Sequence, residues 1–459
     1  MIDLLVVHGT VVTVDQQKKV ISDGAIAVGN DRILGVGPAE EILGQFPEAR
    51  RVITAGGKAV FPGLVNTHTH SFQSLLKGLG DDRVLSDWLA QMTFPAASHL
   101  TPELAGMAAT LSFLDAIRSG TTTILDYFYP HPVPGLADAC LAAMEQTGIR
   151  GIYGRGMIDN GEQYGTPRAI MQCVDDAIQD CERLLKIYPS DTSRKLQVWL
   201  APAAVWLCTR DMLLRVKELQ DQTGCGLTIH VSETLFDREA TRVLHGGSDV
   251  EVMCQLGLMR PSTLLVHVVY LTQEDISLCR QTGVSVSHNP VSNMYLSSGI
   301  APIPELRAAG VNVSLATDGA ASNNSQDMLE VLKSTALLHK VHSLNPTVIR
   351  ADEILEMATI GGARALGMAQ EIGSLEVGKK ADFFIFNPQN HPKSVPMHQP
   401  VSTLVYASSP VNVETVVIDG QIVLDEGKMC LLDEYEALGR ATEAAREIVR
   451  RGQIQGSML

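Results

Sequence analysis

The central part of the chain alternates short, continuous apolar runs with longer segments in which apolar residues recur every three or four positions. Runs rich in β-branched residues predict buried strands, and the periodic segments predict helices. This alternation extends from about residue 59 to residue 371. Strands and helices that follow one another in this way predict a parallel sheet covered by helices.

Eight apolar runs in this central part are predicted strands. They cover residues 59–70, 121–129, 150–159, 196–202, 226–233, 262–271, 284–290 and 311–319. Eight strand–helix units in a segment of this length are typical of a (β/α)₈ TIM barrel. The predicted fold class is therefore α/β, with a barrel that spans residues 59–371.

The two ends of the chain show a different pattern, with short strands separated by Gly, Asp and Asn turns. Residues 1–58 and 372–430 each offer too few strands to bury a core alone, so we expect them to form one small composite β-sandwich domain. Residues 431–459 contain a long helical pattern and are expected to form a C-terminal helix that packs on the body or on another subunit.

Charge and cysteine content limit the function classes. The chain carries 36 Lys and Arg against 51 Asp and Glu, a net charge of −15, which disfavours nucleic-acid binding. Its eight Cys form no Cys-x-x-Cys motif and are expected to be reduced. The first residues follow a strand pattern rather than that of a signal peptide, and no apolar run approaches the roughly 20 residues of a membrane helix. We expect a cytoplasmic enzyme that binds neither nucleic acid nor membrane.

Polar side chains that can bind a metal stand late in four predicted strands. His68 and His70 end the first strand, His230 and His267 lie in the fifth and sixth, and Asp318 stands near the end of the eighth. The C-terminal strand ends of a TIM barrel meet at one face, where such enzymes carry their active sites. Residues i and i+2 of a strand point to the same side, so both histidines of the first strand are expected to face the barrel axis.

Each of these signals is weak alone, since a single buried histidine is more often part of a core. Together they predict a site for one divalent metal ion per subunit, for which Zn²⁺ is the preferred ion and Fe²⁺ is also acceptable. Lys195 precedes the fourth strand, so no lysine at its end supports a second metal. Glu233 lies just past the fifth strand and supplies a carboxylate for proton transfer. Such a site produces hydroxide at neutral pH for attack on an electrophilic carbon.

Longer motifs surround these residues and resemble those of a known family. They are FPGLVNTHTH (61–70), DWL (87–89), HVSET (230–234), SHNPVSNMYLSSGIAPIPEL (287–306), ATDGAASNNSQDM (316–328), MATIGGARALGM (357–368) and IGSLEVGKKADFFIF (372–386). With them the chain resembles the amidohydrolase superfamily, in the branch of the methylthioadenosine/S-adenosylhomocysteine deaminases and the s-triazine hydrolases. The resemblance implies a distorted barrel with a β-sandwich split between the two ends.

The resemblance also implies roles for the site residues. His68, His70, His230 and Asp318 would hold the metal, and Glu233 would move protons between the attacking water and a ring nitrogen. His267 would either hydrogen-bond the hydroxide or polarise the substrate. The implied reaction is hydrolytic displacement at an aromatic ring carbon, with loss of ammonia, an amine or chloride. A homodimer or a higher homo-oligomer is also implied.

Two small residues bear on the substrate. Ala97 and Ala203 stand where the nucleoside deaminases that this chain resembles carry a Glu and a His. Both nucleoside-recognition groups are thus absent, and we expect a small heteroaromatic amine, which is purine-, pterin- or s-triazine-like. Two alternatives remain open, an s-triazine chlorohydrolase and a methylthioadenosine/S-adenosylhomocysteine deaminase.

Further candidates for substrate contact follow from their positions near strand ends. Arg155 is a candidate for a polar or anionic substrate group, although a structural ion pair is equally compatible with its place. Trp206 is a candidate for stacking on a flat ring, or for packing on a helix. Asp126, near the end of the second strand, is a candidate for supporting the site from behind. The other predicted substrate contacts are Gln73, Trp88, His288, Asn289 and Asn293.

Overall fold

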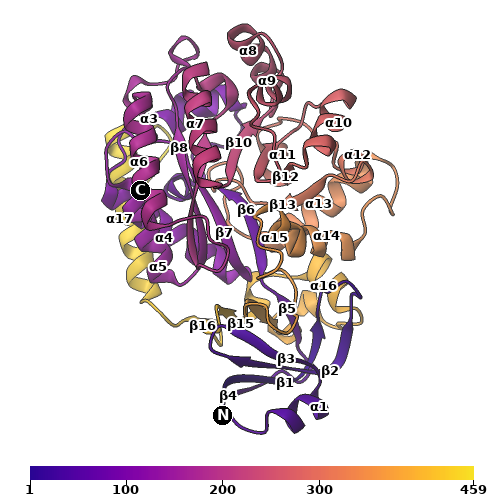
Figure 1. Ribbon diagram of the computed structural model, residues 1–459. Helices are drawn as coiled ribbons and strands as arrows, with labels where there is room; N and C mark the ends of the chain where they lie inside the picture. Colours follow the sequence, from indigo (N-terminus) through magenta and orange to yellow (C-terminus); the bar gives the residue numbers. More distant parts are fainter. Residues whose placement is uncertain (459) are drawn as a thin grey trace.

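The computed structural model describes residues 1–458, in which an eight-stranded parallel sheet curves into a nearly closed barrel (Figure 1). The strands follow one another in sequence order around the barrel, so the predicted α/β barrel is confirmed. They are β6 (Leu64–Thr69), β7 (Thr121–Phe128), β8 (Arg150–Met157), β9 (Leu196–Pro202), β10 (Leu227–Val231), β11 (Thr263–His267), β12 (Ser285–His288) and β13 (Asn312–Leu315).

Helices between the strands cover the barrel. They are α4 (Pro102–Arg118), α5 (Leu136–Thr147), α6 (Val174–Ile187), α7 (Arg210–Thr223), α8 (Leu235–His245), α9 (Asp249–Leu256), α10 (Gln273–Thr282), α11 (Pro290–Tyr295), α12 (Ile303–Ala308), α13 (Met328–His342), α14 (Ala351–Ala358) and α15 (Ile360–Ala365). Short helical turns η3 (Glu162–Tyr164), η4 (Arg168–Ile170) and η5 (Val205–Leu207) lie in the connections. The strands are buried on both faces, as their continuous apolar sequences require.

The connection after β6 is long and irregular. It contains η1 (Ser71–Leu76), α2 (Leu85–Trp88), the π-helix η2 (Leu89–Thr93) and α3 (Phe94–Ala97). π-helical turns are rare and occur frequently at functional sites.

Several barrel strands end earlier than the sequence predicts. β10 stops at Val231 and β13 stops at Leu315. The backbone then leaves the extended conformation, since Ser232 has a φ of 48° and Asp318 a φ of 65°. Both values lie in the left-handed region, which is uncommon for residues other than glycine. The tight turns therefore place Glu233 and Asp318 beyond the strands rather than within them.

The strands from the two ends of the chain form one nine-stranded sheet below the barrel (Figure 1). They are β1 (Ile2–Val12), β2 (Val20–Gly29), β3 (Arg32–Pro38), β4 (Ala49–Thr54), β5 (Ala59–Pro62), β14 (Phe383–Phe386), β15 (Val413–Ile418), β16 (Gln421–Asp425) and β17 (Lys428–Met429). Ile26 of β2 and Val417 of β15 share one apolar cluster although their strands are far apart in the sheet order. The sheet therefore curls over to enclose its own core.

The structure corrects two expectations for these regions. The single strand predicted at 59–70 is divided into β5, which pairs with β1 and β14 in the terminal sheet, and β6, which belongs to the barrel. The break falls after Pro62, at Gly63, where a Cβ atom would lie 1.9 Å from Oγ1 of Thr122. The β-rich ends also contain helices α1 (Ala39–Gln45) and α16 (Pro400–Ala407), with the turns η6 (Pro388–Asn390), η7 (Pro392–Ser394) and η8 (Pro410–Asn412).

The C-terminal helix α17 (Glu434–Gly452) lies against the side of the barrel (Figure 1). It contacts α4, η1 and α3, so it supports the long connection after β6 from outside. Its buried side chains include Ala441, Ala445 and Ile448, whereas most of its charged residues remain in solvent. Across residues 1–458, no helix combines the length and hydropathy needed to cross a membrane.

A buried cation joins the barrel to the terminal sheet. Arg150, the first residue of β8, is fully buried and donates through Nε to Asp382 Oδ2 at 2.7 Å. It also donates through Nη2 to Asp419 Oδ1 at 2.7 Å. Asp382 precedes β14, and Asp419 lies in the turn between β15 and β16. This ion pair network therefore fixes the N-terminal end of the barrel on the sheet.

We expect Arg150→Leu to destabilise the protein by about 3–5 kcal/mol, because it leaves the carboxylate of Asp382 buried without a cation. Arg183→Leu is the matched control, since Arg183 pairs with Asp138 on the surface, where loss of a pair costs about 0–1 kcal/mol. Urea denaturation followed by circular dichroism measures both variants. Equal midpoints for the two variants would show that the buried network does not hold the sheet on the barrel.

Candidate active site

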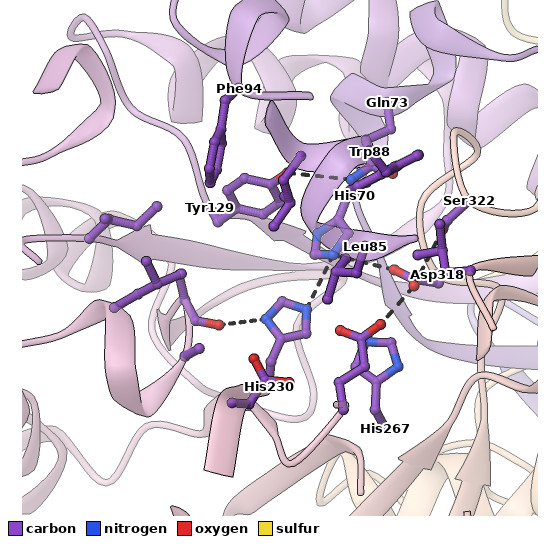
Figure 2. Close-up of a pocket in the computed structure, with 18 of the residues that line it drawn as sticks. His70, Gln73, Leu85, Trp88, Phe94, Tyr129, His230, His267, Asp318 and Ser322 are labelled. Atoms are coloured by element: carbon purple, nitrogen blue, oxygen red, sulfur yellow. Dashed lines mark hydrogen bonds and ion pairs between the residues drawn. The ribbon is translucent and has the colours of Figure 1, made fainter. Parts of the chain in front are cut away.

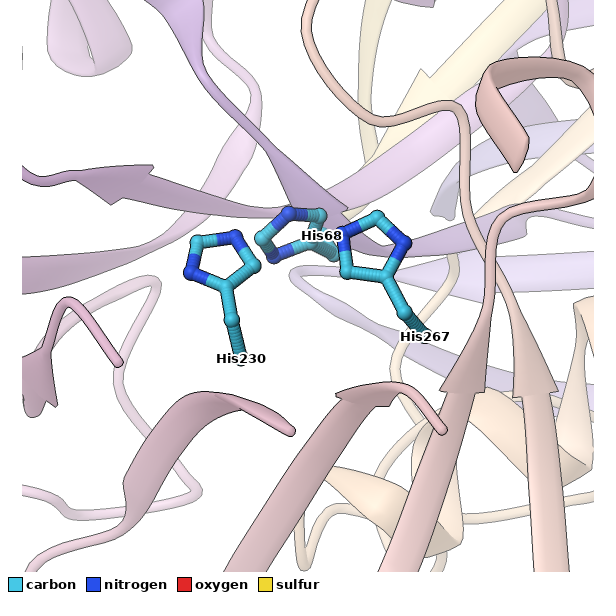
Figure 3. Close-up of side chains that lie close together, drawn as sticks. All are labelled: His68, His230 and His267. Atoms are coloured by element: carbon cyan, nitrogen blue, oxygen red, sulfur yellow. The ribbon is translucent and has the colours of Figure 1, made fainter. Parts of the chain in front are cut away.

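Three imidazoles meet at the C-terminal face of the barrel (Figure 3). His68 belongs to β6, His230 to β10 and His267 is the last residue of β11. His70, two residues after His68, and Asp318, after β13, complete a cluster of five side chains. The structure thus brings together all the predicted metal-binding residues, which come from separate parts of the sequence.

The nitrogen and oxygen atoms of this cluster face one another. Asp318 Oδ1 lies 3.2 Å from His68 Nε2 and 3.3 Å from His70 Nε2. His230 Nε2 lies 3.3 Å from His70 Nε2. Two overlapping sets, His68 with His230 and His267 and His68 with His70 and Asp318, each hold their ligand atoms within 4.8 Å of one another.

The residues fit a divalent cation. Both ring nitrogens of His68 are buried without a hydrogen-bond partner, a costly state for a polar group unless an ion binds there. The cluster offers imidazole nitrogen and carboxylate oxygen without thiolate, which suits zinc or iron. Histidine and carboxylate ligands at a barrel face can hold such an ion and leave a position open for water.

Backbone carbonyls orient two of the imidazoles. His70 Nδ1 lies 2.6 Å from the carbonyl oxygen of Tyr127, and His230 Nδ1 lies 2.5 Å from that of Ala203. An Nδ1–H that donates to a carbonyl leaves the Nε2 lone pair for the cluster. Burial lowers the pKa of His70 to about 3 and holds the pKa of His230 well below its usual range. Both rings are therefore neutral, as metal ligands must be.

Asp318 is held by donors on its own turn and on α11. Its Oδ1 accepts from the backbone N–H of Gly319 at 2.7 Å, and its Oδ2 accepts from Ser292 Oγ at 2.6 Å. The side chain of Gln73 covers Gly319 so closely that a Cβ there would lie 1.8 Å from Gln73 Oε1. The side-chain amide of Gln73 thus occupies the space that a side chain at position 319 would fill.

Glu233 and His267 lie beside the cluster. Glu233 Oε2 is 3.6 Å from His267 Nε2, and Glu233 Oε1 accepts from Ser298 Oγ at 3.1 Å. His267 Nδ1 lies 2.9 Å from Asn293 Oδ1 and 3.3 Å from Asn289 Nδ2. Burial raises the pKa of Glu233 to about 7, which suits a group that takes up and returns a proton near neutrality.

A cavity opens above these residues, with the polar cluster at its base (Figure 2). Its walls are largely apolar and come from the long connection after β6 and from the ends of the neighbouring strands. The wall residues include Leu85, Trp88, Leu89, Phe94, Tyr129, Trp206, Leu207 and Leu296. Flat apolar walls around a few convergent polar groups are typical of a site for a small aromatic molecule.

The predicted substrate contacts divide into three groups. Gln73, Trp88 and Trp206 line the cavity. The indole N–H of Trp88 donates to the carbonyl oxygen of Ala321 at 2.9 Å, which ties the long connection to the loop after β13. Asn289 and Asn293 contact the ring of His267 rather than the open cavity, so they position a site residue.

Arg155 and His288 lie elsewhere, which corrects their prediction as substrate contacts. Arg155 Nε donates to Asp180 Oδ2 at 2.8 Å, so it forms the structural ion pair that its sequence position also allowed. His288 Nε2 lies 3.1 Å from Nε2 of His339 on α13. The buried rings of this histidine pair lie away from the cavity walls.

Asp126 supports the site from behind, as its position near the end of β7 suggested. Its carboxylate accepts from the backbone N–H of Ser71 at 2.9 Å and from Ser71 Oγ at 2.6 Å. Ser71 directly follows His70, so these bonds fix the chain at the end of β6.

Sequence reasoning missed several cavity residues. Tyr129 follows β7 and packs edge-on against His70, with ring centroids 4.9 Å apart. Tyr129 ends a predicted strand, as His70 does, so the expectation that residues at the C-terminal strand ends face the active site applies to Tyr129 as well. Phe94, Leu85 and Leu89 lie on the irregular connection after β6, where no periodic pattern indicates which side chains turn inward.

Comparison with known proteins identifies the family. The family model of the amidohydrolase family matches residues 59–423. A curated 5-methylthioadenosine/S-adenosylhomocysteine deaminase from Syntrophobacter fumaroxidans is 37% identical over 97% of this chain and 98% of its own. A 5'-deoxyadenosine deaminase from Methanosarcina mazei is 35% identical over 98% of this chain and 99% of its own.

Solved structures show the same fold. A zinc-bound adenosine deaminase from Xanthomonas campestris superposes with a TM-score of 0.91 at 32% identity, covering 98% of this chain and 99% of that one. A zinc complex of atrazine chlorohydrolase from Arthrobacter aurescens TC1 superposes with a TM-score of 0.88 at 24% identity, covering 96% and 100%. The latter likeness concerns the fold alone.

The chain belongs to the amidohydrolase family. Within that family it is a metal-dependent aminohydrolase, a hydrolase of carbon–nitrogen bonds in cyclic amidines, which confirms the expectation from the sequence motifs. The need for a divalent metal follows from the family and from the ligand cluster.

We expect metal to stabilise the protein through this cluster. At a free metal concentration about 100-fold above the dissociation constant, binding to the folded state alone adds about 2.7 kcal/mol. Zinc added to chelator-treated protein should therefore raise the melting temperature of the wild type, whereas His68→Ala should show little rise. His342→Ala, at an exposed histidine of α13, is the control and should respond as the wild type does. Stoichiometric metal retained by His68→Ala would contradict this assignment.

Proposed function

We propose that the protein deaminates a flat N-heteroaromatic ring by hydrolysis, using one zinc ion. In this proposal His68, His70, His230 and Asp318 hold the ion. The observation that carries it is the buried convergence of these side chains with Glu233 at the base of an apolar cavity. The zinc-bound relative from Xanthomonas campestris supports zinc as the ion.

The ion, when bound, lowers the pKa of a water molecule toward about 7 and so supplies a nucleophilic oxygen. Glu233 is the proton carrier in our proposal. Its carboxylate accepts a proton as the water attacks the ring carbon and gives it to the adjacent ring nitrogen. His267, 3.6 Å from Glu233, orients the attacking oxygen or polarises the substrate. Asp318 takes part in proton transfer during loss of ammonia, so that water and the amine give the oxo product and ammonia.

The cavity supports a small, flat and uncharged substrate. Trp88, Phe94, Tyr129 and Trp206 offer aromatic surfaces for a ring, and Gln73 Oε1 is buried there without a hydrogen-bond partner. That acceptor suits an N–H of the substrate. We therefore propose a purine-, pterin- or s-triazine-like amine without a large polar substituent.

A second candidate is a deaminase of 5'-substituted adenosines. The names of the relatives from Syntrophobacter fumaroxidans and Methanosarcina mazei favour it. Ala203 lines the cavity with no polar side-chain group, and Ala97 lies buried outside it. The apolar side chain of Ala203 at the cavity favours the free base instead. Hydrolytic loss of chloride from an s-triazine is the third reaction that such a site can perform.

An ammonia-release screen separates these candidates. Purified protein of known metal content is tested with adenine, guanine, their nucleosides, methylthioadenosine and aminotriazines, and chloride release is measured with chlorotriazines. We expect the highest kcat/KM for a free base or an aminotriazine. A higher kcat/KM for methylthioadenosine would establish the second candidate, and chloride release without ammonia would establish the third.

Glu233→Gln should lower kcat by about 10²–10⁴-fold, because the amide cannot carry the proton. Metal content and melting temperature should remain those of the wild type, since Glu233 is not among the proposed ligands. Unchanged turnover in this variant would exclude the proposed mechanism.

A further inference from the structure

The turn that carries Glu233 is held on both sides by buried carboxylates. On one side, the backbone N–H and the Oγ of Ser232 donate to Asp249 Oδ2 at 2.9 and 2.7 Å. On the other side, the backbone N–H and the Oγ1 of Thr234 donate to Asp237 Oδ2 at 2.6 and 2.9 Å. Glu233 itself accepts from Ser298 at only one oxygen.

The second carboxylate also reaches the cavity wall. Asp237 Oδ1 accepts from the indole N–H of Trp206 at 2.8 Å. One side chain therefore joins the Glu233 turn, after β10, to the aromatic wall after β9. Any displacement of Asp237 changes the separation between Glu233 and the surface on which a ring would lie.

Apolar packing alone does not fix this region. The buried residues of α8 are Asp237, Ala240 and Thr241, while its Leu235 and Phe236 are 65% and 46% exposed. The helix therefore depends on polar bonds for its place, and Thr241 Oγ1 supplies one more by donating to Asp249. Ser232 adopts a φ of 48°, an unfavourable conformation that its two bonds to Asp249 offset.

We propose that Asp249 and Asp237 are positioning residues for proton transfer by Glu233, and that Asp237 also sets the place of Trp206. This inference rests on the role of Glu233 proposed above. A proton carrier must lie within hydrogen-bond reach of the atoms it serves, and misplacement by about 1 Å can cost about 10²-fold in rate. Neither carboxylate is among the proposed metal ligands. Asp249 acts through the turn alone, whereas Asp237 acts through the turn and also lines the cavity beside Trp206.

The test uses isosteric variants of the metal-loaded enzyme. Asp249→Asn should lower kcat by about tenfold to 100-fold with KM and metal content within about twofold of the wild type. Asp237→Asn should lower kcat and also raise KM, because an amide cannot accept from both Thr234 and Trp206. Trp206→Phe should raise KM, and its effect should be smaller in the Asp237→Asn background.

Asp382→Asn is the matched control. Asp382 is 3% exposed and accepts from Arg150 and from the backbone N–H of Asp419, but it lies at the opposite end of the barrel and does not line the cavity. This variant should lose stability and keep the wild-type kcat and KM. Equal kinetic behaviour of Asp249→Asn, Asp237→Asn and Asp382→Asn would overturn the proposal.

A double variant separates positioning from general support of the fold. In the Glu233→Gln background the positioned group is already absent, so adding Asp249→Asn should leave the residual kcat unchanged. A merely structural role predicts a further loss in that background, which would overturn the proposal. If Asp249→Asn does not fold, Ser232→Ala is the substitute, because it removes the hydrogen bond that the Ser232 hydroxyl donates to Asp249. An unchanged kcat in Ser232→Ala would also overturn the proposal.

The same variants distinguish a failure of the proposed function from a failure of the positioning inference. An active Glu233→Gln enzyme contradicts the proton-carrier role itself. An inactive Glu233→Gln enzyme together with a fully active Asp249→Asn enzyme contradicts only the positioning inference.

Discussion

The burial of imidazoles and carboxylates at one end of the barrel is the constraint on which the rest of the site depends. Buried polar groups are stable only when hydrogen bonds or ions satisfy them. His70 and His230 meet this requirement with backbone carbonyls, and Asp318 meets it with Gly319 and Ser292. His68 makes no hydrogen bond through either ring nitrogen, and its Nε2 lies 3.2 Å from Asp318 Oδ1, where a bound cation would satisfy both groups.

Hydrogen bonds from buried polar groups also hold the two turns that follow the barrel strands β10 and β13. Ser232 and Asp318 adopt left-handed backbone conformations that aim Glu233 and the Asp318 carboxylate over the barrel. Such conformations persist only where surrounding bonds hold them. Asp249 supplies those bonds on the β10 side. On the β13 side, Thr317, which precedes Asp318, donates to Asn66 and Gln326. Chemistry and local strain thus occur at the same positions.

The terminal sheet and α17 act on the site from farther away. Arg150 holds the sheet to the N-terminal end of β8, opposite the active face. Helix α17 contacts η1 and α3, which bound the connection that carries Trp88 and Phe94. The irregular connection over the cavity is therefore positioned by packing from outside the barrel.

Local pattern sufficed to predict the eight barrel strands, the strand character of both ends and the polar residues late in the strands. The strands were predictable because parallel strands buried on both faces need continuous apolar runs. The site residues were predictable because the C-terminal ends of such strands meet at one face. The division at Pro62 and Gly63 was not predictable, since it depends on the approach of Thr122 from β7.

The sequence by itself determined the fold class and the chemistry, because hydrophobic period and ligand type are local properties of the chain. Only the tertiary structure decided which polar residues face the cavity. In the folded protein Arg155 pairs with Asp180 and His288 contacts His339, whereas Phe94 and Tyr129 line the active-site cavity. The tertiary structure also joined Asp237 and Asp249 to the Glu233 turn. These contacts are set by side-chain direction and by helix packing across distant segments, which no local pattern encodes.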